Sequence, residues 1–300
     1  MNRLKELIEL GFLIDETAKE DINSLNDENY KKLVEALKKE YPLVISQEFI
    51  KKLFIKEVKI LKTFKKRDKL TIKDFVRLLN EKYNTLQKIL LEKLELKDVV
   101  SINKCGSGNV TVIGMIKAIE ERGKTLEVFI EDPTGEIRVS MHKNMGSNLS
   151  LDDVVAISGN INNKILFLDK IIYPDISLRP VNYSDEPAKV AFVSEEKEID
   201  LGYVVMNKGI KDNFKNKFYD IEIPTLIEIS GIKILIIGDF EPLMVLKKRY
   251  LNKENTDFII DVIPDLVFSN KDINKNYKGV TIISPNNIID LKTREINKIL

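Results

Sequence analysis

Histidine, cysteine and acidic residues are the side chains from which this chain would have to build a catalytic or metal-binding site. The 300-residue sequence holds one histidine, His142, and one cysteine, Cys105. A two-metal hydrolytic site keeps its ions about 3.5–4 Å apart with several histidine and carboxylate ligands. A single imidazole cannot supply that set, and a single thiol excludes an internal disulfide and a cysteine-rich metal site. Carboxylates alone, such as Glu195, Glu196 and Asp239, would hold Mg²⁺ weakly, and the competing interpretation is that they are solvated surface acids.

Nucleophiles and phosphate-binding loops are equally sparse. No nucleophile stands out beside a base, and Cys105 is interpreted as a spare reduced thiol in a Gly/Ser-containing loop. Residues 106–108 (GSG) are too short for a nucleotide-binding loop, and they would join a helix to a strand, the reverse of the usual order. The sequence therefore predicts no catalytic residue, no metal and no cofactor.

Composition limits the class of protein further. The chain is 43% hydrophobic and 32% charged, and 48 Lys and Arg against 47 Asp and Glu give a net charge of +1. A protein that binds nucleic acid alone is usually more basic, so any DNA contact is expected to be local or shared. The charged start MNRLKELIEL does not resemble a signal peptide, and no apolar run approaches the ~18 residues of a membrane span. We therefore expect a cytoplasmic protein without membrane contact.

The middle of the chain supplies the elements around which the rest is organised. Residues 132–135 (DPTG) predict a turn, because proline fixes φ and glycine tolerates positive φ. Several short runs, some with alternating polar and apolar residues, predict strands, and these lie at 110–116, 125–130, 136–141, 154–158 and 164–172. Five strands with a central hairpin and a longer link before the fourth indicate a closed barrel of the OB type. A small β-sandwich remains the alternative.

The first hundred residues are predicted to be helical. Residues 2–10 form a short amphipathic helix that ends at Gly11, and residues 24–27 have the spacing of a capping box. A second cap at 71–74 begins the longest helix. Its apolar stripe predicts a small helical core, with Phe75, Leu79, Tyr83, Leu86 and Leu90 on one face.

A lysine-rich stretch, residues 51–69, lies between these predicted helices. Lysine side chains interleaved with aromatic residues would be able to follow DNA phosphates. The competing interpretation is a solvated helix face. The residues proposed for DNA contact are Lys62, Lys65, Lys66 and Arg67.

After the barrel, residues 173–187 hold three prolines and read as an extended linker. Residues 189–193 (KVAFV) form a buried-strand run, and residues 243–251 are predicted to be helical. Further strands are predicted at 203–206, 225–229, 233–237, 266–268 and 279–283, and 288–291 is a candidate to close the sheet. Mixed strands with few helices indicate a small layered α/β domain.

The most specific motifs of the chain surround the predicted barrel. Residues 74–94 (DFVRLLNEKYNTLQKILLEKL) lead into 99–116 (VVSINKCGSGNVTVIGMI), which combines V-S-I-N, a Gly-rich loop and V-T-x-I-G-M. Residues 131–139 (EDPTGEIRV) and 169–176 (DKIIYPDI) follow. With these stretches the chain resembles the small subunit of the archaeal family D DNA polymerases, whose relatives are the non-catalytic B subunits of eukaryotic replicative polymerases.

The resemblance implies a calcineurin-like phosphoesterase domain after the barrel, a two-metal 3′–5′ exonuclease in active members. Residues 190–198 (VAFVSEEKE), 232–240 (IKILIIGDF) and 263–273 (IPDLVFSNKDI) resemble its framework. The region between them leaves room for roughly one βαβ-sized unit of ~30 residues, where the family needs several. The metal-binding residues are replaced, and these degenerate positions are Glu195, Lys197, Gly238, Phe268, Lys271 and Ile273.

From the resemblance we expect an α+β multidomain chain. Its domains are a helical N-terminal domain at 1–98, an OB-fold barrel at 99–180 and a reduced phosphoesterase-like domain at 181–300. The expected function is that of a non-catalytic accessory or scaffold subunit of a family D DNA polymerase in DNA replication. The expected partners are the large catalytic subunit, DNA within the holoenzyme and, as a further candidate, the sliding clamp.

Two alternatives come from other classes of protein. One is a stand-alone single-stranded DNA-binding protein that uses the barrel, since such barrels bind strands through exposed aromatic residues and a basic groove. Phe129 and Phe167 fall in apolar strand runs and are expected in the core, which disfavours this alternative. The other is a residual metal-dependent 3′–5′ exonuclease, which the missing histidine ligands oppose.

Overall fold

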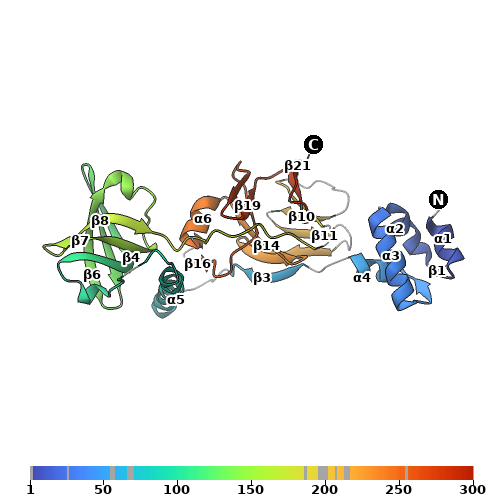
Figure 1. Ribbon diagram of the computed structural model, residues 1–300, viewed down its shortest axis with the longest axis horizontal. Coiled ribbons are helices and arrows are strands. Elements are labelled where there is room, and N and C mark those ends of the chain that lie inside the picture. The colour runs from blue at the N-terminus through green and yellow to red at the C-terminus, as the bar shows by residue number, and fades with distance from the viewer. Residues whose placement is uncertain are drawn as a thin grey trace. The chain divides into compact units, whose positions relative to one another are not determined.

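The computed structural model contains mostly strands, with six α-helices among the residues that it describes (Figure 1). It divides into two compact units, of which unit 1 comprises Met1–Thr63, Tyr183–Ile234 and Pro285–Leu300, and unit 2 comprises Phe64–Asn182 and Leu235–Ser284. The described residues are 3–25, 27–54, 58–65, 71–96, 98–185, 188–194, 202–206, 208–212, 217–253 and 256–299.

A closed barrel of five strands forms the larger part of unit 2, in the order β4-β5-β6-β8-β7. Every strand predicted in this region is present, and most extend beyond the predicted bounds. β6 and β8 pair in parallel, whereas the other pairs are antiparallel. The strands are β4 (Gly108–Arg122), β5 (Thr125–Asp132), β6 (Gly135–His142), β7 (Val154–Asn162) and β8 (Ile165–Ile172).

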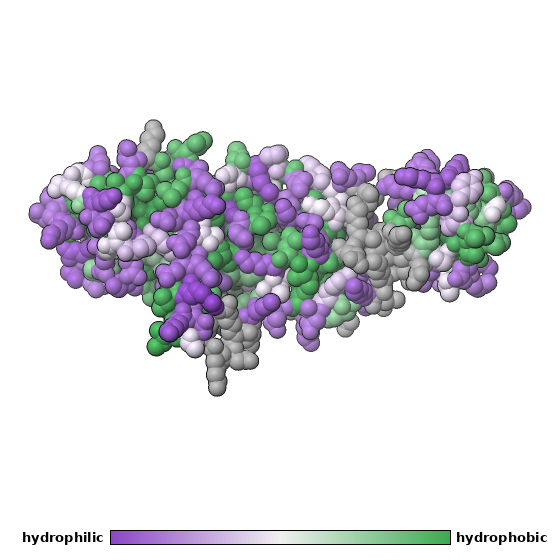
Figure 2. Space-filling model, turned by 90° about the horizontal axis from the view of Figure 1, so that it is seen from below, coloured by the Kyte–Doolittle hydropathy of each residue, from purple (hydrophilic) through white to green (hydrophobic). Residues whose placement is uncertain are grey.

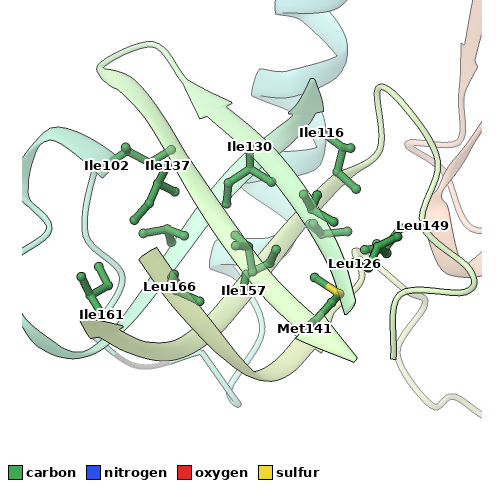
Figure 3. Close-up of a cluster of buried hydrophobic side chains, with 14 residues drawn as sticks. Ile102, Ile116, Leu126, Ile130, Ile137, Met141, Leu149, Ile157, Ile161 and Leu166 are labelled. Atoms are coloured by element: carbon green, nitrogen blue, oxygen red, sulfur yellow. The ribbon is translucent and has the colours of Figure 1, made fainter. Parts of the chain in front are cut away.

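Alternating side chains fill the interior of this barrel (Figure 3). On β5, for example, Leu126, Val128 and Ile130 are buried, while the residues between them are half-buried. Each large apolar side chain removed from water in this way contributes about 1.5–3 kcal/mol. The barrel core therefore follows directly from the period-two pattern of the sequence.

The predicted turn at 132–135 is confirmed, and its aspartate does more than start the turn. The Asp132 carboxylate accepts hydrogen bonds from the backbone N–H of Thr134 at 2.7 Å and of Gly135 at 3.0 Å. Its other oxygen accepts from the N–H of Ile102 at 2.9 Å. One carboxylate thus closes the β5–β6 hairpin and holds the segment that enters the barrel.

Gly159 marks an irregularity in the β7–β8 pairing, where the register shifts between Ser158 and Gly159. A Cβ atom at Gly159 would lie 2.1 Å from the carbonyl oxygen of Phe167 and 2.7 Å from a methyl carbon of Leu166. The backbone of β8 cannot move away without breaking the ladder. This position therefore requires glycine.

We expect Gly159→Ala to lower the free energy of unfolding by about 1–3 kcal/mol, because the added methyl group overpacks the barrel. Urea unfolding followed by circular dichroism measures the change. Gly106→Ala is the matched control, because an added Cβ at Gly106 meets nothing within 4 Å. Equal stability of the two variants would contradict the steric argument.

Helix α5 (Ile72–Leu91) packs on the outside of the barrel with its C-terminal half. The predicted cap is confirmed: the Thr71 hydroxyl accepts from the Asp74 N–H, and the Asp74 carboxylate accepts from the Thr71 N–H. The packed residues of this cluster include Tyr83, Leu86 and Leu90 on the helix and Ile113, Met115, Val154 and Ala156 on the barrel. None of residues 71–81 is buried.

Two further elements of unit 2 are α6 (Pro242–Lys248) and the hairpin of β15 (Tyr250–Lys253) with β16 (Thr256–Ile259). The hairpin meets α5 through a buried ion pair, in which Lys82 Nζ lies 3.0 Å from Asp257 Oδ2 and the two side chains are 1% and 7% exposed. The ammonium also lies 4.1 Å from the centre of the Tyr250 ring. A lysine is thus fully buried between a helix and a hairpin.

Asp153, at the barrel end of the same region, is also buried and fully paired. Its carboxylate accepts a hydrogen bond from the Tyr250 hydroxyl at 2.6 Å and from Lys248 Nζ at 2.7 Å. The backbone N–H of Ser150 donates to it as well, at 2.7 Å. The barrel, α6 and the β15–β16 hairpin are therefore joined by charged hydrogen bonds as well as by apolar packing.

The segment after β8 is held against the strands that follow in unit 2, namely β17 (Leu266–Ser269), β18 (Lys275–Tyr277) and β19 (Val280–Ile283). The Asp175 carboxylate accepts from the Tyr277 hydroxyl and from Lys278 Nζ, both at 2.7 Å. Arg179 pairs with Asp265 and donates to the Pro264 carbonyl. The first part of the predicted linker is therefore docked.

Unit 1 contains a six-stranded sheet in the order β12-β11-β10-β9-β20-β21. Only β9 and β10 pair in parallel. The predicted strands at 203–206 and 189–193 are present, whereas β11, β12 and β21 were not predicted. The strands are β9 (Lys189–Phe192), β10 (Tyr203–Met206), β11 (Gly209–Asp212), β12 (Lys217–Asp220), β20 (Asn287–Asp290) and β21 (Ile296–Lys298).

The beginning of the chain forms a small helical core, as predicted, with the addition of two paired strands. Leu7, Leu33 and Leu37 are fully buried within it. The helices are α1 (Arg3–Glu9), α2 (Lys19–Ser24), α3 (Asp27–Glu40) and α4 (Gln47–Phe54), and the strands are β1 (Leu13–Ile14) and β2 (Val44–Ile45).

Candidate functional site

The degenerate metal-site positions that the structure describes lie at the ends of β14 (Ile232–Gly238) and β17. Gly238 ends β14 with a φ of 63°, and Phe268 is fully buried within β17. Lys271 and Ile273 follow in the next turn, and Lys271 is exposed. The structure brings these positions to neighbouring strand ends, and the two others, Glu195 and Lys197, lie outside the described residues.

Uncharged groups tie these two strand ends together. The Ser269 hydroxyl lies within hydrogen-bond distance of the carbonyls of Gly238 at 3.2 Å and Phe240 at 3.0 Å. The backbone N–H of Asn270 donates to the Gly238 carbonyl at 2.7 Å, and its side-chain amide donates to Asp239 at 2.9 Å. One of the few acids here, Asp239, is therefore engaged by an amide. Sequence reasoning did not find Ser269 or Asn270, because nothing in their types marks a strand-end contact.

Within the described part of the chain, no group of three or more His, Cys, Asp or Glu residues is placed to hold a metal ion. His142 is exposed at the end of β6, where its Nδ1 accepts from the Asn144 N–H at 3.4 Å. Burial, and next Asp132, raise the pKa of the Cys105 thiol above its ordinary value. A thiol with a raised pKa forms little thiolate at neutral pH and is a poor nucleophile.

Of the residues proposed for DNA contact, Lys62 falls on a strand instead of a helix. Residues 59–63 form β3 (Lys59–Thr63), which pairs antiparallel with β13 (Thr225–Ile229). The interpretation as a helix face is therefore wrong for residues 59–63, because a long-range partner strand overrides the local pattern. Lys62 is half-buried and Lys65 is exposed, whereas Lys66 and Arg67 lie outside the described residues. Their contact with DNA remains a prediction.

The outer face of the barrel carries the aromatic residues that the sequence placed in the core. Phe167 on β8 is 48% exposed, and Phe129 on β5 is half-buried. The expectation that Phe167 lies in the core is wrong, because its neighbour Leu166 fills the interior and the alternation turns Phe167 outward. The period-two pattern did not reveal this, because apolar residues occupy both faces of β8.

Ion pairs organise the charges on this face. Glu127 Oε2 lies 3.7 Å from Arg122 and 3.6 Å from Arg138. Lys117 pairs with Glu136 at 2.7 Å and with Glu131 at 3.4 Å. The carboxylates of β5 and β6 are thus largely neutralised by neighbouring cations.

A group of exposed apolar side chains, here called the N-terminal apolar patch, lies on the segment from α1 to β2. Leu13 and Val44 are direct neighbours in the pairing of β1 with β2, and the Tyr41 ring lies 5.8 Å from the Phe12 ring. Figure 2 shows apolar surface on this segment, which lies at the right of the view. The members, each at least 44% exposed, are Ile8, Leu10, Leu13, Tyr41, Leu43 and Val44.

The apolar residues at 203–205 do not form an exposed patch. Tyr203, Val204 and Val205 are buried, because they form β10 inside the six-stranded sheet. Residues 199–201 lie outside the described part. Residues 203–205 therefore offer no exposed apolar surface to a partner.

Among the described residues, no helix is both long enough and apolar enough to pass through a lipid bilayer.

The resemblance to family D small subunits is confirmed by comparison with known proteins. The chain is 28% identical over 130 residues to a protein of Archaeoglobus fulgidus named DNA polymerase II small subunit, a match that covers 41% of this chain and 26% of that protein. It is 29% identical over 152 residues to the small subunit of Pyrococcus furiosus, covering 47% and 24%. The match therefore spans about a quarter of these relatives' length.

No family model matches the chain. Among solved structures, an OBody bound to hen egg-white lysozyme is 18% identical, covers 26% of this chain and 95% of its own, and gives a TM-score of 0.24. The Stn1–Ten1 complex of S. pombe is 21% identical, covers 21% and 56%, and gives a TM-score of 0.21. Because both TM-scores are below 0.5, neither structure supports a conclusion about the fold or the function of this chain.

Proposed function

We propose that this chain is a non-catalytic accessory subunit of a replicative family D DNA polymerase, located in the cytoplasm, that supports the large catalytic subunit. The observation that carries the proposal is the similarity to archaeal proteins named DNA polymerase II small subunit. In this proposal DNA is a partner within the holoenzyme, and the sliding clamp is a further candidate. The chain supplies surfaces for assembly instead of a reaction centre.

The proposal assigns the barrel to the OB fold and the segment after it to a reduced calcineurin-like phosphoesterase domain. A closed Greek-key barrel of five strands supports the first assignment. The strand ends around Gly238 and Phe268 support the second, because they lie on neighbouring strands of one sheet, as the resembled framework requires. The domain division at 98 and 180 remains part of this proposal.

The N-terminal apolar patch supports an assembly role. Stable obligate interfaces often bury more than about 2,000 Å² and are more apolar at their centre than ordinary surface. Six large apolar side chains at least 44% exposed on one small helical segment would be unfavourable in a protein that works alone. A large partner subunit would cover them.

Co-expression with the large subunit of the source organism tests the proposal. We expect a 1:1 complex that survives high salt, because apolar contacts are not screened. Leu13→Asp with Leu43→Asp should weaken the complex at least tenfold, measured by co-purification and by titration of the labelled chain. Leu178→Asp is the control, since Leu178 is 83% exposed and lies outside the patch. A chain that ignores the large subunit, or a patch variant that binds as the parent does, contradicts the proposal.

We also expect no metal-dependent hydrolysis of single-stranded or mismatched-primer DNA above background with Mn²⁺ or Mg²⁺. The histidine ligand positions of the resembled motifs hold other residues, and Asp239 is bound by the Asn270 amide. The measurement is release of nucleotides from an end-labelled primer. Activity that disappears in the Glu195→Ala, Asp239→Ala double variant would instead establish the residual exonuclease.

A further inference from the structure

The first two turns of α5, residues 72–78 and here called the α5 arm, carry exposed apolar side chains. Ile72 is 85% exposed, Val76 is 50% exposed and Phe75 is 43% exposed. The helical repeat places all three on the same face as Tyr83, which is buried against the barrel. The apolar face of α5 therefore continues past the packed part of the helix.

Local interactions keep the arm helical although its apolar side chains are exposed. The Thr71 hydroxyl and the Asp74 carboxylate form a reciprocal cap at its start. The Arg77 guanidinium lies 3.4 Å from Asp74 and 3.9 Å from Glu81, which are three and four residues away on the same helix. Such pairs stabilise a helix without tertiary contacts. An arm that is already helical loses little conformational entropy when a partner binds.

A shallow groove of about 430 Å³ lies along one side of α5. Its walls are two rows of side chains with a four-residue step, Ile72, Val76, Asn80 and Asn84 in one row and Lys73, Arg77 and Glu81 in the other. The longer row spans about 18 Å. A groove between rows of this step accepts the matching row of another α-helix, which is the commonest helix packing in globular proteins. The groove therefore fits a helix.

The side chains of the groove indicate the chemistry of that helix. Ile72 and Val76 offer apolar contacts at one end of the groove. Arg77 is already paired with two acids of α5, whereas Lys73 is exposed and has no ion pair in the part of the chain that the structure describes. A helix that carries an apolar row with an acidic residue beside it would complement both features.

The size of the groove indicates where that helix comes from. A stable interface between two proteins uses about 20–30 residues on each side, and seven residues line this groove. A contact this small does not hold a second copy of the chain by itself. It suits a partner that is also held elsewhere, as the large subunit is at the N-terminal apolar patch in the proposed function.

We propose that the α5 arm binds an amphipathic helix of the large catalytic subunit, with Ile72 and Val76 against its apolar row and Lys73 paired with one of its acidic residues. The apolar contacts supply affinity, and the ion pair fixes the orientation of the helix. This inference rests on the proposed function and adds a second contact to it, on the unit that contains the barrel.

Titration of the labelled full-length chain with the purified large subunit of the source organism measures the contribution of the arm. We expect Val76→Asp to bind about tenfold more weakly, because a carboxylate replaces an apolar contact in the groove. Lys73→Glu should also bind more weakly, since repulsion replaces the ion pair, whereas Lys73→Arg should bind as the parent does. Leu94→Asp, at a position that is 97% exposed and outside the groove, is the control. Circular dichroism and thermal unfolding show that the variants fold.

Hydrogen exchange locates the contact on both proteins. In the complex, the backbone amides of residues 72–78 should exchange about tenfold more slowly than in the free chain, because the bound helix suppresses local opening of the arm. The Val76→Asp variant should lose this protection. The segment of the large subunit that loses protection with the same variant identifies the bound helix.

Three outcomes overturn this inference and leave the proposed function intact. The first is a folded Val76→Asp variant that binds the large subunit as tightly as the parent. The second is unchanged exchange of residues 72–78 in the complex. The third is a dimer of the free chain that Val76→Asp dissociates, which would assign the arm to a second copy. A chain that forms no complex with the large subunit overturns the proposed function and this inference together.

Discussion

We expect Lys82→Met to lower the free energy of unfolding by about 3–5 kcal/mol, because removing one partner of a buried ion pair leaves the other charge buried without a counter-ion. Asp257 is 7% exposed, and Lys82 Nζ at 3.0 Å is its counter-ion. The variant also loses the cation above the Tyr250 ring. Urea unfolding, followed by circular dichroism, gives the change.

A double variant separates charge from packing. Lys82→Met with Asp257→Leu removes both charges and should recover most of the lost stability, since replacing a buried pair by apolar residues is often neutral or stabilising. Lys73→Met, at an exposed position on the same helix, is the control and should unfold like the parent. A Lys82→Met variant as stable as the parent would show that Asp257 is solvated.

Raising the pH from 10 to 12 should also destabilise the protein strongly. Burial raises the pKa of Tyr83 and of Tyr173 to about 12, in each case with a nearby aspartate adding to the effect. Burial and the Asp153 carboxylate raise the pKa of Tyr250 as well. All three phenols are therefore favoured in their neutral form in the folded state.

The direction of the effect follows from where each phenol loses its proton. In the unfolded chain a tyrosine has a pKa of about 10, so below that pH both states are protonated and the stability is fully present. As the pH rises from 10 through 12, only the unfolded state ionises, and Tyr83 and Tyr173 each lose about 3 kcal/mol of their contribution to the free energy of unfolding. Unfolding curves at a series of pH values measure the loss.

Tyr83→Phe isolates one contribution. The variant should lose stability with pH less steeply, by about 1.4 kcal/mol per pH unit between 10 and 12, because one ionising group is gone. It should also be slightly less stable at neutral pH, since the Tyr83 hydroxyl donates to the Ile113 carbonyl at 3.2 Å. Tyr41→Phe, with a side chain 74% exposed, is the control. An unchanged slope in Tyr83→Phe would contradict the assignment.

The strands of the barrel could be predicted because their cores are local and periodic. Leu126, Val128 and Ile130 alternate with half-buried residues, and the proline and glycine of the DPTG sequence specify the turn. The β3 strand could not be predicted, because Lys59–Thr63 is short and rich in lysine and its partner β13 lies about 160 residues away. Pairing at that distance leaves no trace in the local pattern.

The candidate sites also contain features that the sequence predicted and features that it did not. The sequence located the strand ends at Gly238 and Phe268, because framework residues there follow a recognisable pattern. It could not identify Ser269 and Asn270 as the groups that join those ends, nor the burial of Lys82, which reads as an ordinary solvated lysine on a helix. Each depends on which distant residue the fold brings near.

Helix α5 also has a mechanical consequence. Its 20 residues span about 30 Å, yet the packing described for this helix begins with Leu79 and its buried side chains begin at Lys82, so its first two turns extend past the packed contact. The helix is anchored to the β15–β16 hairpin by the Lys82–Asp257 pair, and the turns before this pair extend beyond the anchor. A force on the free arm, at Ile72 or Val76, would be delivered as torque to the barrel wall and the β15–β16 hairpin together. A partner that binds the first two turns of α5 would therefore act on the barrel and the hairpin together.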